Sequence, residues 1–231
     1  MSSTIFQKSL LTNRACAVTI HYMKTRVVIV NISSCEKLLA MPERFCSVQR
    51  LEKCAAIGNP SVRMQGYAAE LALSFALSGE ALLPPEYGYE ESGRPVIKNG
   101  YVSLTHSGGW AACAVSNAPI GVDLEQIRPI GRGIARRILS PIERREFEAC
   151  SDTNYLLRKF VMKEAFFKMT GEGISGGFRD VMESNNRLFR CGVLAGFPHH
   201  FEDRSYLGCV VTAEEGSVEY IDLADRVFAD K

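Results

Sequence analysis

The sequence predicts an α+β protein made of two similar halves, and three observations lead to this prediction. Strand-like and helix-like segments of ordinary length share the 231 residues. Hydrophobic residues make up 46% of the chain, enough for an ordinary apolar core. The same order of elements then occurs twice: a strand, a charged helix, a long apolar helix and paired strands. An internal duplication of about 100 residues, with its boundary near Asn117, explains this order.

The first half is expected to begin with a strand over 26–32, because RVVIVNI is β-branched and almost entirely apolar. Helical spacing and glycine or proline breaks define the elements that follow. These are helices over 41–56 and 61–78, and two strands over 101–116 around Gly108-Gly109.

The second half repeats the pattern. Its predicted elements are a strand over 120–125, a charged helical segment over 128–150, a helix over 154–170 that ends at Gly171, and a clear strand over 206–212. We therefore divide the chain into a non-structural N-terminal extension (1–22), an N-terminal half (23–117) and a C-terminal half (118–231). The extension has basic residues and no acidic ones, so a transit peptide is the alternative interpretation of it.

Composition excludes several classes of protein. The net charge of +1 argues against a strongly cationic nucleic-acid binder, and no run of 18 apolar residues suggests a membrane span. The eight cysteines form no C-x-x-C pair, and no histidine lies at zinc spacing from them. Scattered cysteines in a chain of this size favour reduced thiols and a cytoplasmic location.

The predicted strand over 120–125 carries two carboxylates. Side chains alternate between the faces of a strand, so Asp123 and Glu125 share one face with Gly121, which leaves space beside them. A solvated outer face of the sheet would show the same pattern. The strand alone therefore does not establish a functional site.

The helix over 154–170 carries a third carboxylate at an unusual place. Its apolar stripe includes Leu157, Phe160 and Val161, and Glu164 falls in the middle of that stripe, with Lys168 one turn further. An unpartnered carboxylate in a core costs several kcal/mol, roughly. Glu164 therefore needs a metal, a cation or a cleft, and a Glu164–Lys168 bridge at a helix contact is the structural alternative.

Together, Asp123, Glu125 and Glu164 form a hard oxygen donor set, which suits Mg²⁺ and a phosphate-containing substrate. Hydroxyl groups and His106 precede the glycine turn at 108–109, where backbone amides are able to hold phosphate. Further candidate phosphate partners are basic residues of the first half, each of which is also explained as a surface charge: Arg50, Lys53, Arg63 and Arg94.

Four segments in order resemble the surfactin-synthetase-type (Sfp-type) 4′-phosphopantetheinyl transferases. They are Gly93-Arg94-Pro95, Leu104-Thr105-His106-Ser107, the 120–125 segment IGVDLE and the 160–168 segment FVMKEAFFK. The last two match the family signatures G-x-D-x-E and K-E-[AS]-x-x-K. The resemblance runs from about Arg26 to the carboxyl end.

The resemblance implies two α+β halves related by a pseudo-twofold axis, with coenzyme A and the active site in the cleft between them. It implies Mg²⁺-dependent transfer of 4′-phosphopantetheine from coenzyme A to a serine of an apo acyl or peptidyl carrier protein, releasing 3′,5′-ADP, as in a holo-[acyl-carrier-protein] synthase. The catalytic residues would be Asp123, Glu164 and Lys168, with Asp123, Glu125 and Glu164 as metal ligands. The base would be Glu164 or a water that it holds. Coenzyme A would contact Arg50, Lys53, Arg63, Arg94, Thr105, His106, Lys163 and Lys168.

The segment 126–145 is arginine-rich and suggests a docking surface for an acidic carrier protein, although a solvated helix face fits as well. By resemblance, a duplicated chain of this kind acts as a monomer. The competing hypotheses are another Mg²⁺-dependent phosphotransferase or phosphodiesterase, and a coenzyme A-binding relative that has lost the chemistry. The complete set of three carboxylates and Lys168 argues against the last of these.

Overall fold

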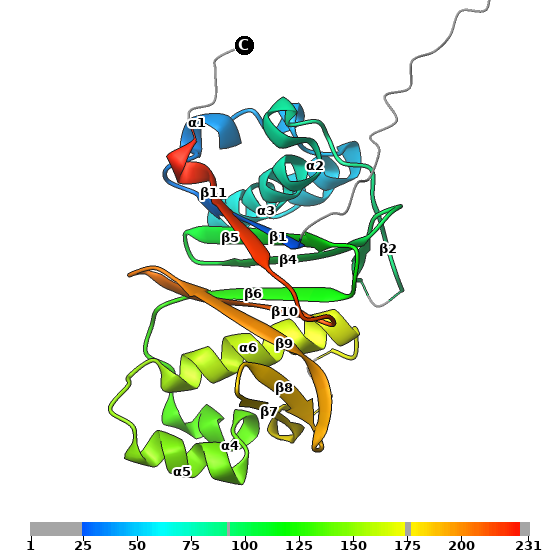
Figure 1. The fold of residues 1–231 in the computed structure, drawn as a ribbon. Coiled ribbons are helices and arrows are strands. Elements are labelled where there is room, and N and C mark those ends of the chain that lie inside the picture. Colours follow the sequence, from blue (N-terminus) through cyan, green and yellow to red (C-terminus); the bar gives the residue numbers. More distant parts are fainter. Residues whose placement is uncertain (1–24, 92, 174–176, 227–231) are drawn as a thin grey trace, which may run out of the picture.

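A computed structural model of the protein describes residues 25–91, 93–173 and 177–226. Two β-sheets face each other at the centre, and helices cover the outer face of each sheet (Figure 1). Helices α1–α3 lie on the first sheet, and α4–α6 lie on the side of the second. The prediction of a mixed α and β protein is therefore confirmed.

The first sheet has the strand order β11-β1-β5-β4, and the second has the order β6-β10-β9-β8-β7. The strands of the first sheet are β1 (Thr25–Asn31), β4 (Tyr101–Ser107), β5 (Trp110–Ser116) and β11 (Val218–Asp222). Those of the second are β6 (Ile120–Gln126), β7 (Val181–Ser184), β8 (Arg187–Arg190), β9 (Val193–Glu202) and β10 (Tyr206–Thr212). A small separate sheet pairs β2 (Gly88–Tyr89) with β3 (Pro95–Val96).

The helices are α1 (Glu36–Leu39), α2 (Val48–Ala55), α3 (Pro60–Ser78), α4 (Ala135–Ile138), α5 (Pro141–Ala149) and α6 (Tyr155–Thr170). Short 3₁₀ helices cover Pro42–Arg44, Gly79–Ala81, Arg132–Ile134, Phe178–Asp180 and Leu223–Asp225. The two long helices begin and end as their sequences predict. Asn59 caps α3 ahead of Pro60, and α6 ends at Gly171, which has a φ of 75°.

Two predicted helices are interrupted. The segment 128–150 forms a 3₁₀ turn, α4 and α5, because Ser140 is extended before Pro141 and its hydroxyl group caps α5. The segment 41–56 likewise breaks into a 3₁₀ turn and α2, whose N-cap is Ser47. In both places a capping serine starts a new helix, and this outweighs the helical periodicity across the break.

Three apolar layers hold the fold together. Residues such as Val28 and Leu71 form the core between the first sheet and α3, and Phe166 and Val211 belong to the core between the second sheet and α6. A third cluster lies between the two sheets and includes Val27 and Val122. Alternation in each strand explains this layering, since one face of a strand meets a helix and the other meets the opposite sheet.

The two sheets share a pairing pattern. In the first, β1 pairs with β5 and β5 with β4; in the second, β6 pairs with β10 and β10 with β9, and all four pairings are antiparallel. A long helix, α3 or α6, follows the first strand of each set. Two features lie outside this common pattern: the additional strands β7 and β8 in the second sheet, and β11, which joins β1 in parallel.

No helix among the described residues is long and apolar enough to cross a membrane. The seven described cysteines, from Cys35 to Cys209, are all free thiols, as expected. The N-terminal extension predicted over 1–22 lies outside the described residues.

Candidate active site

Strand β6 carries two of the candidate metal ligands. The strand lies between helix α6 and the first sheet. Ile120, Val122 and Leu124 point into the layer between the sheets, so Asp123 and Glu125 lie on the other face. Gly121 shares that face and touches α6: a Cβ atom at this position would lie 1.9 Å from the Ala165 carbonyl oxygen. Only glycine allows this approach, which brings the β6 carboxylates to the face of α6.

Asp123 is buried and its two oxygens differ. Its Oδ1 accepts hydrogen bonds from Thr105 Oγ1 at 2.9 Å and from Lys168 Nζ at 2.7 Å. Its Oδ2 is buried and has no hydrogen-bond partner within the described part of the chain. A buried carboxylate oxygen without a donor is costly, so this atom is available to a cation or another ligand.

Glu125 lies further along β6 at the rim of the site. Its Oε2 accepts a hydrogen bond from Ser107 Oγ at 2.6 Å, and the exposed Arg128 lies 3.5 Å from the same oxygen. Thr105 and Ser107 on β4 therefore each contact one carboxylate of β6, which fixes the orientation of both acidic groups.

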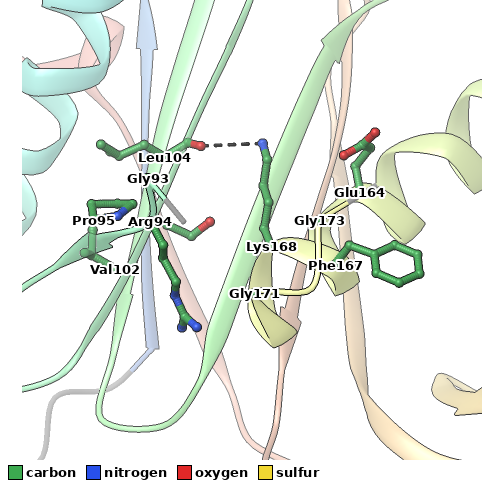
Figure 2. A pocket seen from close by; sticks show the side chains of 11 residues that line it. Gly93, Arg94, Pro95, Val102, Leu104, Glu164, Phe167, Lys168, Gly171 and Gly173 are labelled. Carbon is green, nitrogen blue, oxygen red and sulfur yellow. Dashed lines mark hydrogen bonds between the residues drawn. The ribbon is translucent and has the colours of Figure 1, made fainter. Parts of the chain in front are cut away.

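Glu164 on α6 is buried, as its place in the apolar stripe predicts. Burial is the largest cause of a raised pKa at this carboxyl group; Asp123 and Glu125 also raise it, Lys168 lowers it, and the net pKa is about 7. Lys168 does not form the alternative ion pair with Glu164. Its Nζ donates to Asp123 and also to the Leu104 carbonyl oxygen at 3.5 Å (Figure 2).

These side chains border two adjoining cavities. One, of about 340 Å³, lies beside Arg94, Leu104, Phe167 and Lys168 (Figure 2). The other, of about 410 Å³, is lined by Asp123, Glu125 and Glu164 and also by groups from the first half. Glu164 and Lys168 line both cavities. The site thus combines a larger polar compartment with a smaller, mostly apolar one.

The first half contributes the basic wall of the larger cavity, through Arg50, Lys53 and His106. Lys53 lies over the ring of Tyr89, 5.2 Å from its centroid. Burial lowers the pKa of His106, and the charges of Lys168 and Arg50 lower it further, which favours a neutral imidazole. The cationic groups of Arg50 and Lys53 thus line the same cavity as the three carboxylates, an arrangement suited to a phosphate ligand with a bound cation.

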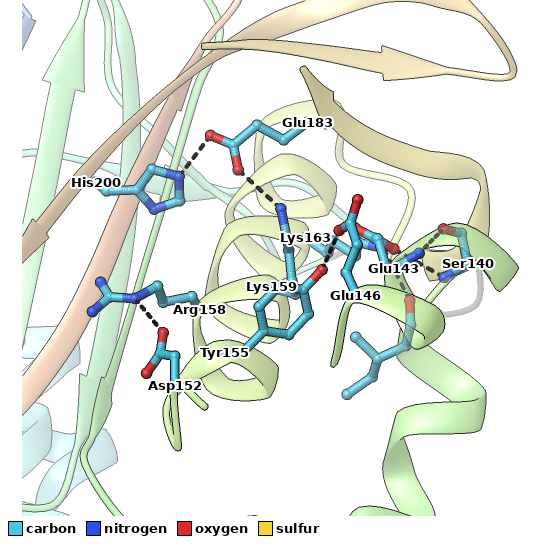
Figure 3. Close-up of polar contacts among 11 residues, drawn as sticks. Ser140, Glu143, Glu146, Asp152, Tyr155, Arg158, Lys159, Lys163, Glu183 and His200 are labelled. Carbon is cyan, nitrogen blue, oxygen red and sulfur yellow. Dashed lines mark hydrogen bonds and ion pairs between the residues drawn. The ribbon is translucent and has the colours of Figure 1, made fainter. Parts of the chain in front are cut away.

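Two of the predicted coenzyme A contacts lie elsewhere. The guanidinium group of Arg63 donates to the Ile57 carbonyl oxygen at 2.8 Å. Lys163 is fully buried, and its Nζ donates to Glu143 Oε2 at 2.6 Å and to the Ile138 carbonyl oxygen at 3.0 Å (Figure 3). Neither residue lines the two cavities, so their predicted contacts have no counterpart in this geometry.

Sequence reasoning missed a set of polar residues in the first half. Glu70 is fully buried in α3, and Arg50 and Tyr87 both donate hydrogen bonds to its Oε2. Tyr89 also lines the larger cavity, as does the apolar Phe160 of α6 in the second half. A signal for Glu70 was present, because a carboxylate within a long apolar helix needs a partner, as Glu164 does.

The donor set fits Mg²⁺ in its chemistry. Its ligands would be carboxylate oxygens, and the partnerless Asp123 Oδ2 offers one directly. Over residues 25–91, 93–173 and 177–226, no three His, Cys, Asp or Glu side chains already stand in a metal-binding arrangement. Lys168 instead bonds Asp123, which partly balances the acidic cluster.

Comparison with known proteins points to one superfamily. Residues 119–207, which contain β6 and α6, match the 4′-phosphopantetheinyl transferase superfamily. A Bacillus subtilis protein named 4′-phosphopantetheinyl transferase is 30% identical over 138 residues, or 56% of this chain and 62% of that protein. The psf-1 4′-phosphopantetheinyl transferase of Bacillus pumilus is 40% identical over 94 residues, or 38% of this chain and 40% of that protein.

The Sfp 4′-phosphopantetheinyl transferase of Bacillus subtilis strain 168 is 29% identical over 140 residues, or 57% of this chain and 62% of that protein. These matches confirm the resemblance to the Sfp-type 4′-phosphopantetheinyl transferases that the two motifs indicate. The chain aligns with less than two thirds of the length of each of these three relatives.

Proposed function

We propose that this protein transfers the 4′-phosphopantetheine group of coenzyme A to a serine hydroxyl of an apo acyl or peptidyl carrier protein, with 3′,5′-ADP as the other product. The observation that carries the proposal is one cavity lined by Asp123, Glu125, Glu164 and Lys168 and also by basic groups of the first half. The similarity to 4′-phosphopantetheinyl transferases over the segment with β6 and α6 supports it. Within this class, we propose a holo-[acyl-carrier-protein] synthase type of activity.

Mg²⁺ would be held by Asp123, Glu125 and Glu164. Bound there, the ion would neutralise charge on the pyrophosphate of coenzyme A. Lys168 would supply positive charge to the same phosphates, and Arg50, Lys53, Arg94 and His106 would contact the nucleotide part. The hydrogen bonds from Thr105 and Ser107 keep the β6 carboxylates oriented toward the cavity.

Transfer needs the serine oxygen to attack the β-phosphorus of coenzyme A. A new P–O bond forms, the bond from that phosphorus to the bridging oxygen breaks, and 3′,5′-ADP leaves with the electron pair. The serine proton passes to Glu164, or to a water that Glu164 holds. Glu164 lines both cavities, so its carboxylate is available to a group entering from either one.

We also propose that the two sheets belong to halves related by a pseudo-twofold axis, divided near Asn117, with the active site in the cleft between them. The shared pairing pattern of β1-β5-β4 and β6-β10-β9 supports this arrangement. The residues that line the larger cavity come from both halves. On this proposal the chain acts as a monomer. Strand β11 is an addition to the repeated pattern and pairs with β1 in the first sheet.

The carrier protein would dock on the arginine-rich segment 126–145. A cavity of about 600 Å³ is lined by Arg136, Arg137 and Arg179 and also reaches Glu164. An acidic carrier would meet these charges while its serine approaches the acidic cluster. The free thiols support a cytoplasmic site of action.

The activity test incubates the protein with coenzyme A, Mg²⁺ and several apo carrier proteins and measures the mass of each carrier. A gain of one phosphopantetheine group is expected, and Asp123→Ala should lose at least about 100-fold in rate, because it removes a metal ligand. Binding of coenzyme A without any mass gain would favour a non-catalytic relative, and cleavage of other phosphate esters would favour a different phosphotransferase.

The docking test compares Arg136→Glu/Arg137→Glu with Arg187→Glu, a surface arginine of β8 that does not line this cavity. The double variant should raise the KM for carrier protein about 10-fold, since like charges then face the carrier, and leave the KM for coenzyme A unchanged. An unchanged carrier KM would contradict the proposed docking surface.

A further inference from the structure

Glu70 is the buried acidic residue of α3, next to Ala69, which lines the larger cavity. Both of its carboxylate oxygens are occupied. Oε2 accepts hydrogen bonds from Arg50 Nε at 3.0 Å and from Tyr87 Oη at 2.8 Å. Oε1 accepts from the Ser47 hydroxyl at 3.2 Å and from its backbone amide at 3.4 Å. Helix α2, which begins after Ser47, is thereby joined to α3 through one carboxylate.

This network reaches the cavity at two points. Arg50 lines the larger cavity, and Tyr89, which also lines it, shares a hydrogen bond of 3.2 Å with Tyr87. The hydrogen bond to Glu70 uses only Nε, one of the five N–H donors of the guanidinium group. Glu70 thus orients a cationic group and an aromatic ring in the cavity wall without lining the cavity.

On the proposed duplication, Glu70 would correspond to Glu164 in the other half. Each is a buried acidic residue of the long helix that follows the first strand of its set. Their environments differ: Glu164 lies among other carboxylates and faces the cavities, whereas donors saturate Glu70. A saturated carboxylate bonded to an arginine is suited to holding that arginine and not to binding a metal.

We propose that Glu70 is a positioning residue that acts through Arg50 and the Tyr87–Tyr89 pair to hold the coenzyme A-binding wall of the cavity. This inference rests on the proposed function, because coenzyme A is the anionic ligand that the wall would meet. An unrestrained arginine must lose side-chain freedom when it binds a phosphate, and the hydrogen bond to Glu70 removes that freedom beforehand. The same carboxylate also keeps α2 against α3 through Ser47.

The test compares Glu70→Gln with the wild type by calorimetry with coenzyme A and by transfer kinetics. Glutamine keeps the shape and can still accept from Tyr87, but it loses the charge that orients Arg50. We expect the Kd and the KM for coenzyme A to rise about 10-fold, while kcat stays within about threefold. In an Arg50→Ala background, Glu70→Gln should add no further weakening, because the residue acts through Arg50.

The matched control is Glu143→Gln, which removes a buried carboxylate that pairs with a basic residue, Lys163, outside the two cavities. It should lower the melting temperature without changing the affinity for coenzyme A. If Glu70→Gln fails to fold, Tyr87→Phe tests the same network and should raise the Kd.

The two proposals fail differently. An unchanged Kd for folded Glu70→Gln, or additive losses with Arg50→Ala, would overturn the positioning role. A wild-type protein that binds coenzyme A but modifies no carrier would overturn the proposed function and leave the positioning role measurable through Kd. A wild type that binds no coenzyme A would overturn the positioning role as well.

Discussion

Lys163 is the first lysine of the K-E-[AS]-x-x-K motif. Replacing it by methionine tests whether this lysine stabilises the fold or binds a ligand. Its Nζ is fully buried, 2.6 Å from Glu143 Oε2 and 3.0 Å from the Ile138 carbonyl oxygen (Figure 3). Burial lowers the pKa of Lys163, and Glu143 raises it, so the ion pair offsets part of the cost of burying the ammonium group.

The expected loss of stability follows from what the substitution leaves behind. Methionine fills a similar volume, but Glu143 then stays buried without its ammonium partner, and removing one partner of a buried pair costs about 3–5 kcal/mol. Glu143 keeps one contact, since its Oε2 also accepts from the Ser140 backbone amide at 2.9 Å in the cap of α5. We therefore expect a loss near 3 kcal/mol, at the low end of that range.

Urea unfolding followed by circular dichroism measures the free energy, and calorimetry measures coenzyme A binding. Lys163→Met should lower the free energy of unfolding and leave the Kd for coenzyme A within about twofold. The double variant Lys163→Met/Glu143→Gln should recover part of the loss, because no unpaired charge stays buried. A stability loss below about 1 kcal/mol, or a Kd raised at unchanged stability, would refute this reasoning.

Two further predictions concern the second half. Gly121→Ala should lower the free energy of unfolding by more than about 2 kcal/mol, since its Cβ would lie 1.9 Å from the Ala165 carbonyl oxygen; equal melting temperatures would contradict the close approach. Burial raises the pKa of Glu183, but His200 and Lys159 lower it more, to about 2. Because this folded-state pKa is below the ordinary value of 4.5, the group stabilises the fold above that pH and loses the effect as the pH falls toward 2. Glu183→Gln should thus cost about 2–3 kcal/mol at pH 7 and less than half of that near pH 3 in urea titrations, and a difference independent of pH would contradict the assignment.

The sequence predicted the elements that carry strong local signals. The β-branched strand β1, the paired strands β4 and β5, and the long helices α3 and α6 lie within a residue or two of their predicted ranges. The charged segment 128–150 was predicted as one helix, because its periodicity hides the break at Ser140-Pro141. The site was also predicted only where the local signal is strong. The carboxylates of β6 and α6 belong to recognisable motifs, whereas the residues that bond Arg50 belong to no motif.

The sequence by itself determined which side chains share a face: strand alternation put Asp123 and Glu125 together with Gly121, and helical periodicity put Glu164 on a buried stripe. The tertiary structure decided which groups meet across elements. Lys168 forms an ion pair with Asp123 and not with Glu164. Lys163 forms a buried pair with Glu143, and Glu70 forms an ion pair with Arg50. The face on which a side chain lies follows from the short repeat of a strand or helix, which is visible in the local sequence. The partner of a buried charge depends on how distant elements pack, because the group that best offsets the cost of its desolvation is far away in the sequence.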